Sequence, residues 1–415
     1  MMKIRTQVIQ NLIKQLRRKK SLQEIKEMEL GSNSKLNPYK HSNNLVKLVI
    51  LIVILAVCIS LLVLLNQKDS SIHSFIAGVK NRILDASSIS ISSIQFEPGM
   101  YPVFTPYADG LVCAKADGFK IYNIHGQEEW SESQVLSNPL VKADGRYMAI
   151  ADIGGKNVYA YRNKNKIWTK SVDGEILNAS INEKGYVVLV FKDSSRKSIV
   201  KVFDNNGTEI LVRYYSNNYA IDAKVSPDCR IIAVGEVNAS GFKTTCGVRF
   251  IPIGSKEDSG VFEEDSIIGS MDFMDKNLVI ALNNKLLSIS QDGTKTVLSD
   301  FGKSKVTNID INRGKFIVKV QKANGFLNWS SNIDIINKNG KTIGSFELKD
   351  KVINIDARGD IISVNAGDKV VFLNSSGKQI SQFSPKKDVK EVKLLRDGSA
   401  AGIVYVDSIE IVNIY

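Results

Sequence analysis

Cysteine and histidine are scarce in this sequence. Its 415 residues include four cysteines and three histidines. So few cysteines exclude a small fold held together by a dense set of disulfides. His41, His73 and His125 are far apart in the chain, which leaves little material for a zinc site or a histidine-based catalytic centre. We therefore predict no metal ion, no cofactor and no catalytic residues.

The sequence also lacks an even distribution of charge. Residues 1–67 contain eleven of the 55 basic residues and three of the 43 acidic ones, and so contribute +8 of the net charge of +12. The rest of the chain is close to neutral for its size. A nucleic-acid-binding domain concentrates basic residues on a folded surface. Here they lie beside an apolar segment, so we expect no nucleic-acid partner.

That apolar segment, Leu48–Leu65, has 18 residues and no charged side chain. As a helix it would be about 27 Å long, close to the thickness of the hydrocarbon core of a bilayer. A buried core helix is the weaker alternative, because globular helices of this length normally have a polar face. The run is longer than a secretory signal and begins deep in the chain. The sequence therefore predicts an uncleaved transmembrane helix over 45–66.

The charges around this span predict its orientation. The excess of basic residues before it places residues 1–44 in the cytoplasm and the C-terminal part outside the cell membrane. Apolar residues recur every four positions from Ile4 to Leu16, with a basic cluster beside and after them: Lys14, Arg17, Arg18, Lys19 and Lys20. This pattern predicts an amphipathic helix on anionic lipid or against a partner helix; alternatively, the cluster only determines topology. Residues 67–87 are predicted to form a stalk.

From residue 88 to 415, apolar and polar residues alternate in short runs separated by turn residues. This pattern is typical of an all-β domain. One turn recurs eight times at intervals of about 40 residues, beginning at Ala108, Ala143, Glu183, Pro227, Met274, Asn312, Ala357 and Arg396. Four antiparallel strands in a repeat of that length form a propeller blade. We therefore predict an eight-bladed β-propeller outside the membrane, with seven blades as the alternative.

The last repeat stops at Tyr415, where its fourth strand is due. An unassigned strand, 88–96, precedes the first repeat. Propellers are commonly closed by pairing one terminus into the blade of the other, which removes an exposed sheet edge. We predict that 88–96 is the outer strand of the last blade.

Two repeats carry a family resemblance. Residues 158–181, VYAYRNKNKIWTKSVDGEILNASI, and 119–133, FKIYNIHGQEEWSES, resemble the repeats of quinoprotein-type propellers, with Trp168 and Trp130 on the outer strand. That family includes quinone-cofactor dehydrogenases and a scaffold lipoprotein of outer-membrane assembly. The whole layout is similar to an uncharacterised family of single-pass bacterial proteins with propeller ectodomains, a domain of unknown function. The resemblance implies an architecture and no activity.

The residues themselves do not support the enzymatic branch of that resemblance. The dehydrogenases carry adjacent cysteines over the cofactor, whereas Cys113, Cys229 and Cys246 are isolated here. The segments 204–207 and 337–340 are interpreted as hairpin turns rather than calcium loops. Acids from different blades can meet at the centre of a ring, but no strand shows a repeated inward acid in the sequence pattern.

One insertion stands out from the repeats. Residues 322–332 separate the second and third strands of the sixth repeat and contain Phe326, Leu327 and Trp329. Apolar residues on a loop tip are candidates for partner contact; alternatively, the loop folds onto its own blade. We predict a non-catalytic scaffold or interaction module of the bacterial cell envelope, bound to an envelope protein or cell-wall partner. A ligand-sensing receptor is the alternative, and a quinoprotein-like or carbohydrate-active enzyme is less favoured.

Overall fold

The structure is a computed structural model of the whole chain, and it describes residues 92–97, 102–255, 257–264, 266–302, 306–312, 315–322, 330–395 and 397–415. All of these residues belong to one compact unit, Asn81–Tyr415. Their regular secondary structure consists of 32 β-strands. No helix in this part of the chain is long and apolar enough to cross a membrane. The predicted span 45–66, stalk 67–87 and basic cluster of 1–44 lie outside the described residues.

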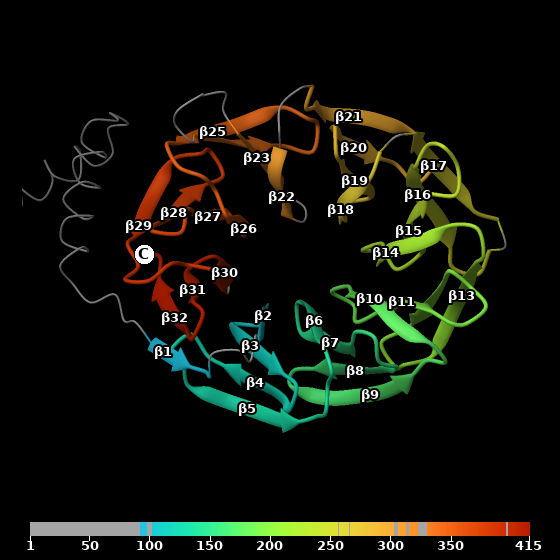
Figure 1. Ribbon diagram of the computed structural model, residues 1–415, viewed down its shortest axis with the longest axis horizontal. Helices are drawn as coiled ribbons and strands as arrows, with labels where there is room; N and C mark the ends of the chain where they lie inside the picture. Colours follow the sequence, from blue (N-terminus) through green and yellow to red (C-terminus); the bar gives the residue numbers. More distant parts are fainter. Residues whose placement is uncertain are drawn as a thin grey trace, which may run out of the picture. The chain divides into compact units, whose positions relative to one another are not determined.

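The strands form eight four-stranded antiparallel sheets arranged in a ring, which confirms the prediction of eight blades (Figure 1). Blades 1 to 4 consist of β2 (Val103–Tyr107), β3 (Gly110–Lys115), β4 (Gly118–Tyr122) and β5 (Glu128–Ser133); β6 (Pro139–Asp144), β7 (Tyr147–Asp152), β8 (Asn157–Arg162) and β9 (Asn165–Ser171); β10 (Glu175–Ile181), β11 (Val187–Lys192), β12 (Ser198–Phe203) and β13 (Glu209–Tyr215); and β14 (Tyr219–Val225), β15 (Ile231–Asn238), β16 (Thr245–Pro252) and β17 (Ser259–Glu264).

Blades 5 to 7 continue the same order, with the first strand innermost. They consist of β18 (Ile268–Met274), β19 (Asn277–Leu282), β20 (Lys285–Ile289) and β21 (Lys295–Asp300); β22 (Val306–Asn312), β23 (Phe316–Lys322), β24 (Ser331–Ile336) and β25 (Thr342–Leu348); and β26 (Asn354–Arg358), β27 (Ile361–Asn365), β28 (Val370–Asn374) and β29 (Gln379–Phe383). Blade 8 contains β30 (Glu391–Leu395), β31 (Ala400–Val404), β32 (Ser408–Asn413) and, as its outer strand, β1 (Ser92–Gln95).

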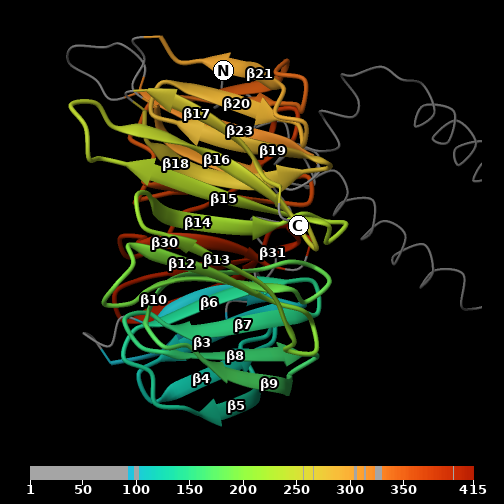
Figure 2. The ribbon, with the colours of Figure 1, turned by 90° about the vertical axis from the view of Figure 1, so that its right-hand side faces the viewer.

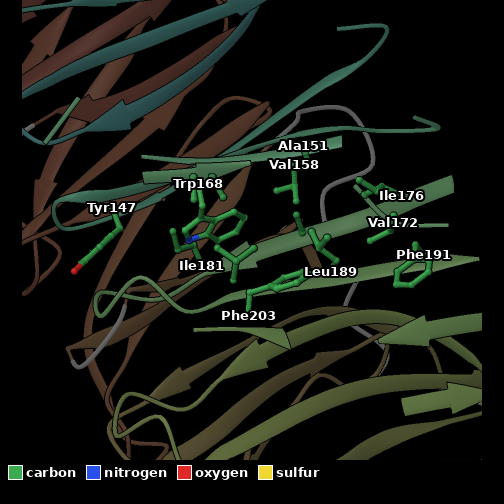
Figure 3. Close-up of a cluster of buried hydrophobic side chains, with 14 of the residues drawn as sticks. Tyr147, Ala151, Val158, Trp168, Val172, Ile176, Ile181, Leu189, Phe191 and Phe203 are labelled. Atoms are coloured by element: carbon green, nitrogen blue, oxygen red, sulfur yellow. The ribbon is translucent and has the colours of Figure 1, made fainter. Parts of the chain in front are cut away.

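The core lies between neighbouring blades. Each sheet has two buried faces, so its middle strands are almost continuously apolar, as in β11 with the sequence VVLVFK. Between blades 2 and 3, Trp168 packs against Phe203 with ring centroids 5.6 Å apart, beside Val158 and Leu189 (Figure 3). The predicted outer-strand position of Trp168 on β9 and of Trp130 on β5 is confirmed. Burial of such clusters between sheets is the main stabilising term of the ring.

The ring is closed by β1, as predicted. β1 pairs antiparallel with β32, with Ile94 opposite Ile409, and the amide of Phe96 donates to the carbonyl of Asp407 at 3.0 Å. Ile94 and Phe96 pack against the core between blades 8 and 1. Gly126 has a φ of 70°, and a Cβ there would lie 2.7 Å from the Cβ of Ser92, so β1 requires glycine at this turn of blade 1.

Candidate functional site

The strand order defines two faces of the ring, which are seen edge-on in Figure 2. Turns between the first and second strands and between the third and fourth strands lie on one face, which we call the first-turn face. Turns between the second and third strands and the links between blades lie on the opposite face, which we call the connection face. Ser92 lies on the first-turn face beside Gly126.

The innermost strands carry polar side chains that bond to the next blade. An innermost strand has a ladder partner on one side only, so some of its backbone groups need other partners. Thr105 Oγ1 donates to Val141 O at 3.2 Å, and Ser180 Oγ donates to Ala223 O at 2.5 Å. Asn308 Nδ2 donates a hydrogen bond to Ile353 O, and Asn354 Nδ2 donates one to Val392 O. These bonds tie the inner strands around the ring.

Carboxylates occupy equivalent positions in consecutive blades. Asp310 Oδ2 accepts the N–H of Ala357 at 2.6 Å, and Asp356 Oδ2 accepts the N–H of Leu394 at 2.6 Å. Asp272 stands two residues before the end of β18, as Asp310 and Asp356 do in β22 and β26. The sequence interpretation that no strand shows a repeated inward acid is therefore wrong. The repeat was missed because blades 1 to 4 have Thr105, Lys142, Ala179 and Ala223 at this position.

Burial changes the ionisation of the acids in blades 6 and 7. It raises the pKa of Asp310 to about 7, with a further contribution from the charge of Asp356. It also raises the pKa of Asp356, against the attraction of Lys393. Burial lowers the pKa of Lys393, but Glu391, whose Oε1 lies 2.7 Å from Nζ, and Asp356 raise it by more.

The opposite side of the centre combines acids and lysines from blades 2, 4 and 5. Burial raises the pKa of Asp272 to about 6, and the charge of Lys224 opposes this shift. Lys224 Nζ lies 3.4 Å from Asp222 Oδ2. Burial, followed by repulsion from Lys224, lowers the pKa of Lys142. Charged groups from three blades therefore act on one another at the centre of the ring.

A cavity of about 310 Å³ opens beside these groups at the first-turn face. Its walls come from the inner-strand ends and first turns of four consecutive blades, 2 to 5. Its acidic residues are Asp144, Glu183, Asp272 and Asp275, and its one basic residue is Lys224. Its apolar walls are formed by Ile181, Val225, Pro227 and Phe273. A concave site with apolar walls and a few convergent charges is typical of a small-ligand site.

The acids of this cavity do not converge as metal ligands do. Among the described residues, no group of three or more His, Cys, Asp and Glu side chains is arranged to hold a metal ion. The segments 204–207 and 337–340 are hairpin turns: Asp204 Oδ1 accepts the amides of Asn206 and Thr208, and Asn337 Oδ1 accepts two amides in the same way. Their side-chain oxygens accept hydrogen bonds from backbone amides within the turns, as expected for the predicted hairpin turns. Cys113, Cys229 and Cys246 are free thiols.

The predicted partner contact, Phe326, Leu327 and Trp329, lies outside the described residues. The strands on either side are described: β23 ends and β24 begins on the connection face. The insertion therefore joins the second and third strands of blade 6, as the sequence indicated. Its role as a contact stays a prediction.

The connection face carries exposed apolar side chains that the repeat pattern did not reveal. Eleven large apolar side chains among the described residues are exposed, and eight of them lie at this end of the blades: Val135, Leu177, Tyr214, Tyr219, Phe242, Ile267, Ile353 and Val406. The signal was available, because these residues interrupt otherwise polar links and turns. It was weak, because single surface apolar residues are common.

The fold defines the class of this protein as an eight-bladed β-propeller closed by its N-terminal strand. The chain belongs to a family of unknown function, DUF5711, which matches it over residues 87–414. No curated protein matches the sequence.

Solved structures of other proteins share the fold at low sequence identity. A eukaryotic initiation factor has a TM-score of 0.53 at 11% identity, with 75% of this chain and 84% of that chain covered. The C-terminal WD40 domain of Sif2 also has a TM-score of 0.53 at 11% identity, with 77% and 98% covered. BamB from Moraxella catarrhalis is similar at 18% identity and a TM-score of 0.48, with 77% and 95% covered. At such identities the likeness to the first two shows the fold alone.

Proposed function

We propose that this propeller is a non-catalytic interaction module of the bacterial cell envelope, and that a partner protein binds to its connection face. The observation that carries the proposal is a patch on blades 3 and 4, formed by Arg196, Lys197, Tyr214, Tyr219 and Phe242, which we call the blade 3–4 patch. It combines aromatic side chains with basic ones on a single face.

The patch is held in place by contacts within blade 3 and between blades 3 and 4. The guanidinium carbon of Arg196 lies 4.2 Å from the ring centroid of Tyr214, and Lys197 Nζ lies 4.9 Å from that of Tyr219. Lys197 Nζ also donates to Asn217 O at 2.8 Å and to Ser240 Oγ at 3.2 Å. The second of these bonds reaches the loop that carries Phe242. These contacts hold Lys197, Tyr214 and Tyr219 in place before a partner arrives, which lowers the entropic cost of binding.

The composition of the patch suits a protein partner. Tyr, Phe and Arg are enriched at protein–protein interfaces, and hot spots are often Tyr or Arg. Phe242 is fully exposed and Tyr214 is 59% exposed, so both have apolar area to bury. A broad rigid ring presents such a face to a partner.

The envelope location is proposed from the sequence. The apolar run within 45–66 and the basic residues before it support a single-pass anchor with its C-terminal domain outside. Ser92 lies on the first-turn face, opposite the patch.

The test is crosslinking of the full-length protein in membranes, with the partner identified by mass spectrometry and its affinity then measured. Phe242→Ala and Tyr219→Ala are each expected to weaken binding about tenfold, corresponding to loss of a buried aromatic contact. Val297→Ala is the matched control, because Val297 is 56% exposed on the outer strand β21, away from both faces. Equal affinity of all three variants and the native protein would contradict the proposal.

A further inference from the structure

The cavity at the first-turn face is large enough for a small organic ligand. Its volume of about 310 Å³ equals that of about ten water molecules at ~30 Å³ each. It lies on the face opposite the blade 3–4 patch. Binding of a partner to the blade 3–4 patch therefore does not account for this cavity.

The charges of the cavity favour a cation. Four acidic residues line it against the single base Lys224, and the ammonium group of Lys224 already has Asp222 as a neighbour at 3.4 Å. At the rim, Asp275 pairs with Lys338 at 2.9 Å, but both side chains are more than half exposed. An exposed ion pair of this kind contributes little and can be exchanged for a ligand. Among the residues that line the cavity, acidic side chains therefore outnumber basic ones by four to one.

The arrangement of the acids favours an organic cation over a metal ion. The acids come from three blades, and no three of them are grouped as metal ligands among the described residues. The lining also includes Ile181, Val225 and Phe273, which are at least nine-tenths buried. Such walls suit the methylene groups of a ligand, whereas separated carboxylates suit ammonium groups.

We propose that this cavity binds a primary amine carried on an apolar stem of about four or five carbons. Two sources present that chemistry: a free diamine, or the lysine side chain of a peptide. Asp272 lies within β18 and Asp144 at the end of β6, both half-buried, whereas Glu183 and Asp275 lie in exposed first turns. The site would give the propeller a second binding function, independent of a partner on the connection face.

Binding should depend on pH because Asp272 must be ionised to attract the ammonium group. The pKa of Asp272 is raised to about 6 by burial, so its charge is lost as the pH falls below that value. The charged groups that act on it are Lys224 and Asp222 of blade 4 and Lys142 of blade 2. Amine affinity is expected to rise between about pH 5 and pH 7.5.

The experiment is calorimetric titration of the full-length protein with 1,5-diaminopentane and, separately, with a tripeptide that has a central lysine and blocked ends. At about pH 7.5 we expect a Kd on the order of 0.1–1 mM for at least one of them. The uncharged analogue 1,5-pentanediol should not bind. If only the diamine binds, the ligand is a free amine; if only the peptide binds, it is a partner's lysine.

Two variants separate the site from a general charge effect. Asp272→Asn is expected to weaken amine binding at least tenfold, and this variant should fold, because it removes a buried charge. Asp360→Asn is the matched control: Asp360 also lies in a first turn and pairs with a lysine, Lys315, at 3.0 Å, but it does not line the cavity. Absence of binding by both amines, equal binding of the diol, or unchanged affinity in Asp272→Asn would overturn the proposal. None of these results bears on the blade 3–4 patch.

Discussion

The strand that closes the ring offers the sharpest test of how the propeller is held together. Ile94 on β1 is half-buried and packs on the core between blades 8 and 1, whereas its neighbour Gln95 is exposed. We predict that Ile94→Thr weakens the attachment of β1 to blade 8. Full burial of an isoleucine contributes about 1.5–3 kcal/mol, so a half-buried one that keeps its β-branch should lose about 1 kcal/mol.

A buried thiol reports directly on this attachment. Cys113 is 4% exposed and lines a pocket of about 240 Å³ together with Ile94 and Phe96. Burial raises the pKa of this thiol to about 11, so it is both covered and uncharged in the closed ring. A loss of about 1 kcal/mol increases the population in which β1 has detached about fivefold. The rate of maleimide labelling at Cys113 should increase by the same factor.

The assay is labelling of the folded protein, followed by mass spectrometry of the peptides that carry Cys113 and Cys246. Cys246 is fully buried in blade 4 and serves as the internal control. Ser93→Thr introduces the same residue at an exposed position of β1 that does not line this pocket, and should leave both rates unchanged. An unchanged Cys113 rate in Ile94→Thr would refute the reasoning. Equal acceleration at Cys246 would show global unfolding instead of release of β1.

Further predictions concern the centre, the insertion and the topology. Burial raises the pKa of Asp310 to about 7 from 3.8, so its ionisation destabilises the fold progressively as the pH rises from about 4 to 7. Asp310→Asn should therefore increase the free energy of unfolding at pH 8 by about 2 kcal/mol, and by at most about 4. Urea titration should show this increase at pH 8 and little effect at pH 4. Trp329→Ala should weaken partner capture while the melting temperature barely changes, and a large fall in melting temperature would make Trp329 a core residue. External protease applied to intact cells should remove the propeller and leave residues 1–44 protected; recovery of a mature form lacking residues 1–60 would contradict the uncleaved anchor.

Much of this fold can be predicted from the sequence because its information is local. A four-stranded blade is encoded within about 40 consecutive residues, so alternation and turns such as Ala143-Asp144-Gly145 predicted both the strands and the number of blades. Ring closure could be predicted by counting strands, because the last repeat lacks its fourth strand and one unassigned strand precedes the first repeat. The segments 204–207 and 337–340 were likewise assigned to hairpin turns because each ends in Asn-Gly and lacks the spacing of a calcium loop.

Only the tertiary structure shows which side chains lie close together at the centre of the ring and on its two faces. Lys142, Asp272 and Asp310 come from blades 2, 5 and 6 and lie near the centre of the ring only because eight inner strands converge on one axis. Their pKa shifts depend on burial by other blades, which no single repeat encodes. Tyr214 and Phe242 likewise share a surface because blades 3 and 4 stand side by side. Repeat periodicity determines the ring, whereas the sites arise from side chains at positions where the repeats differ.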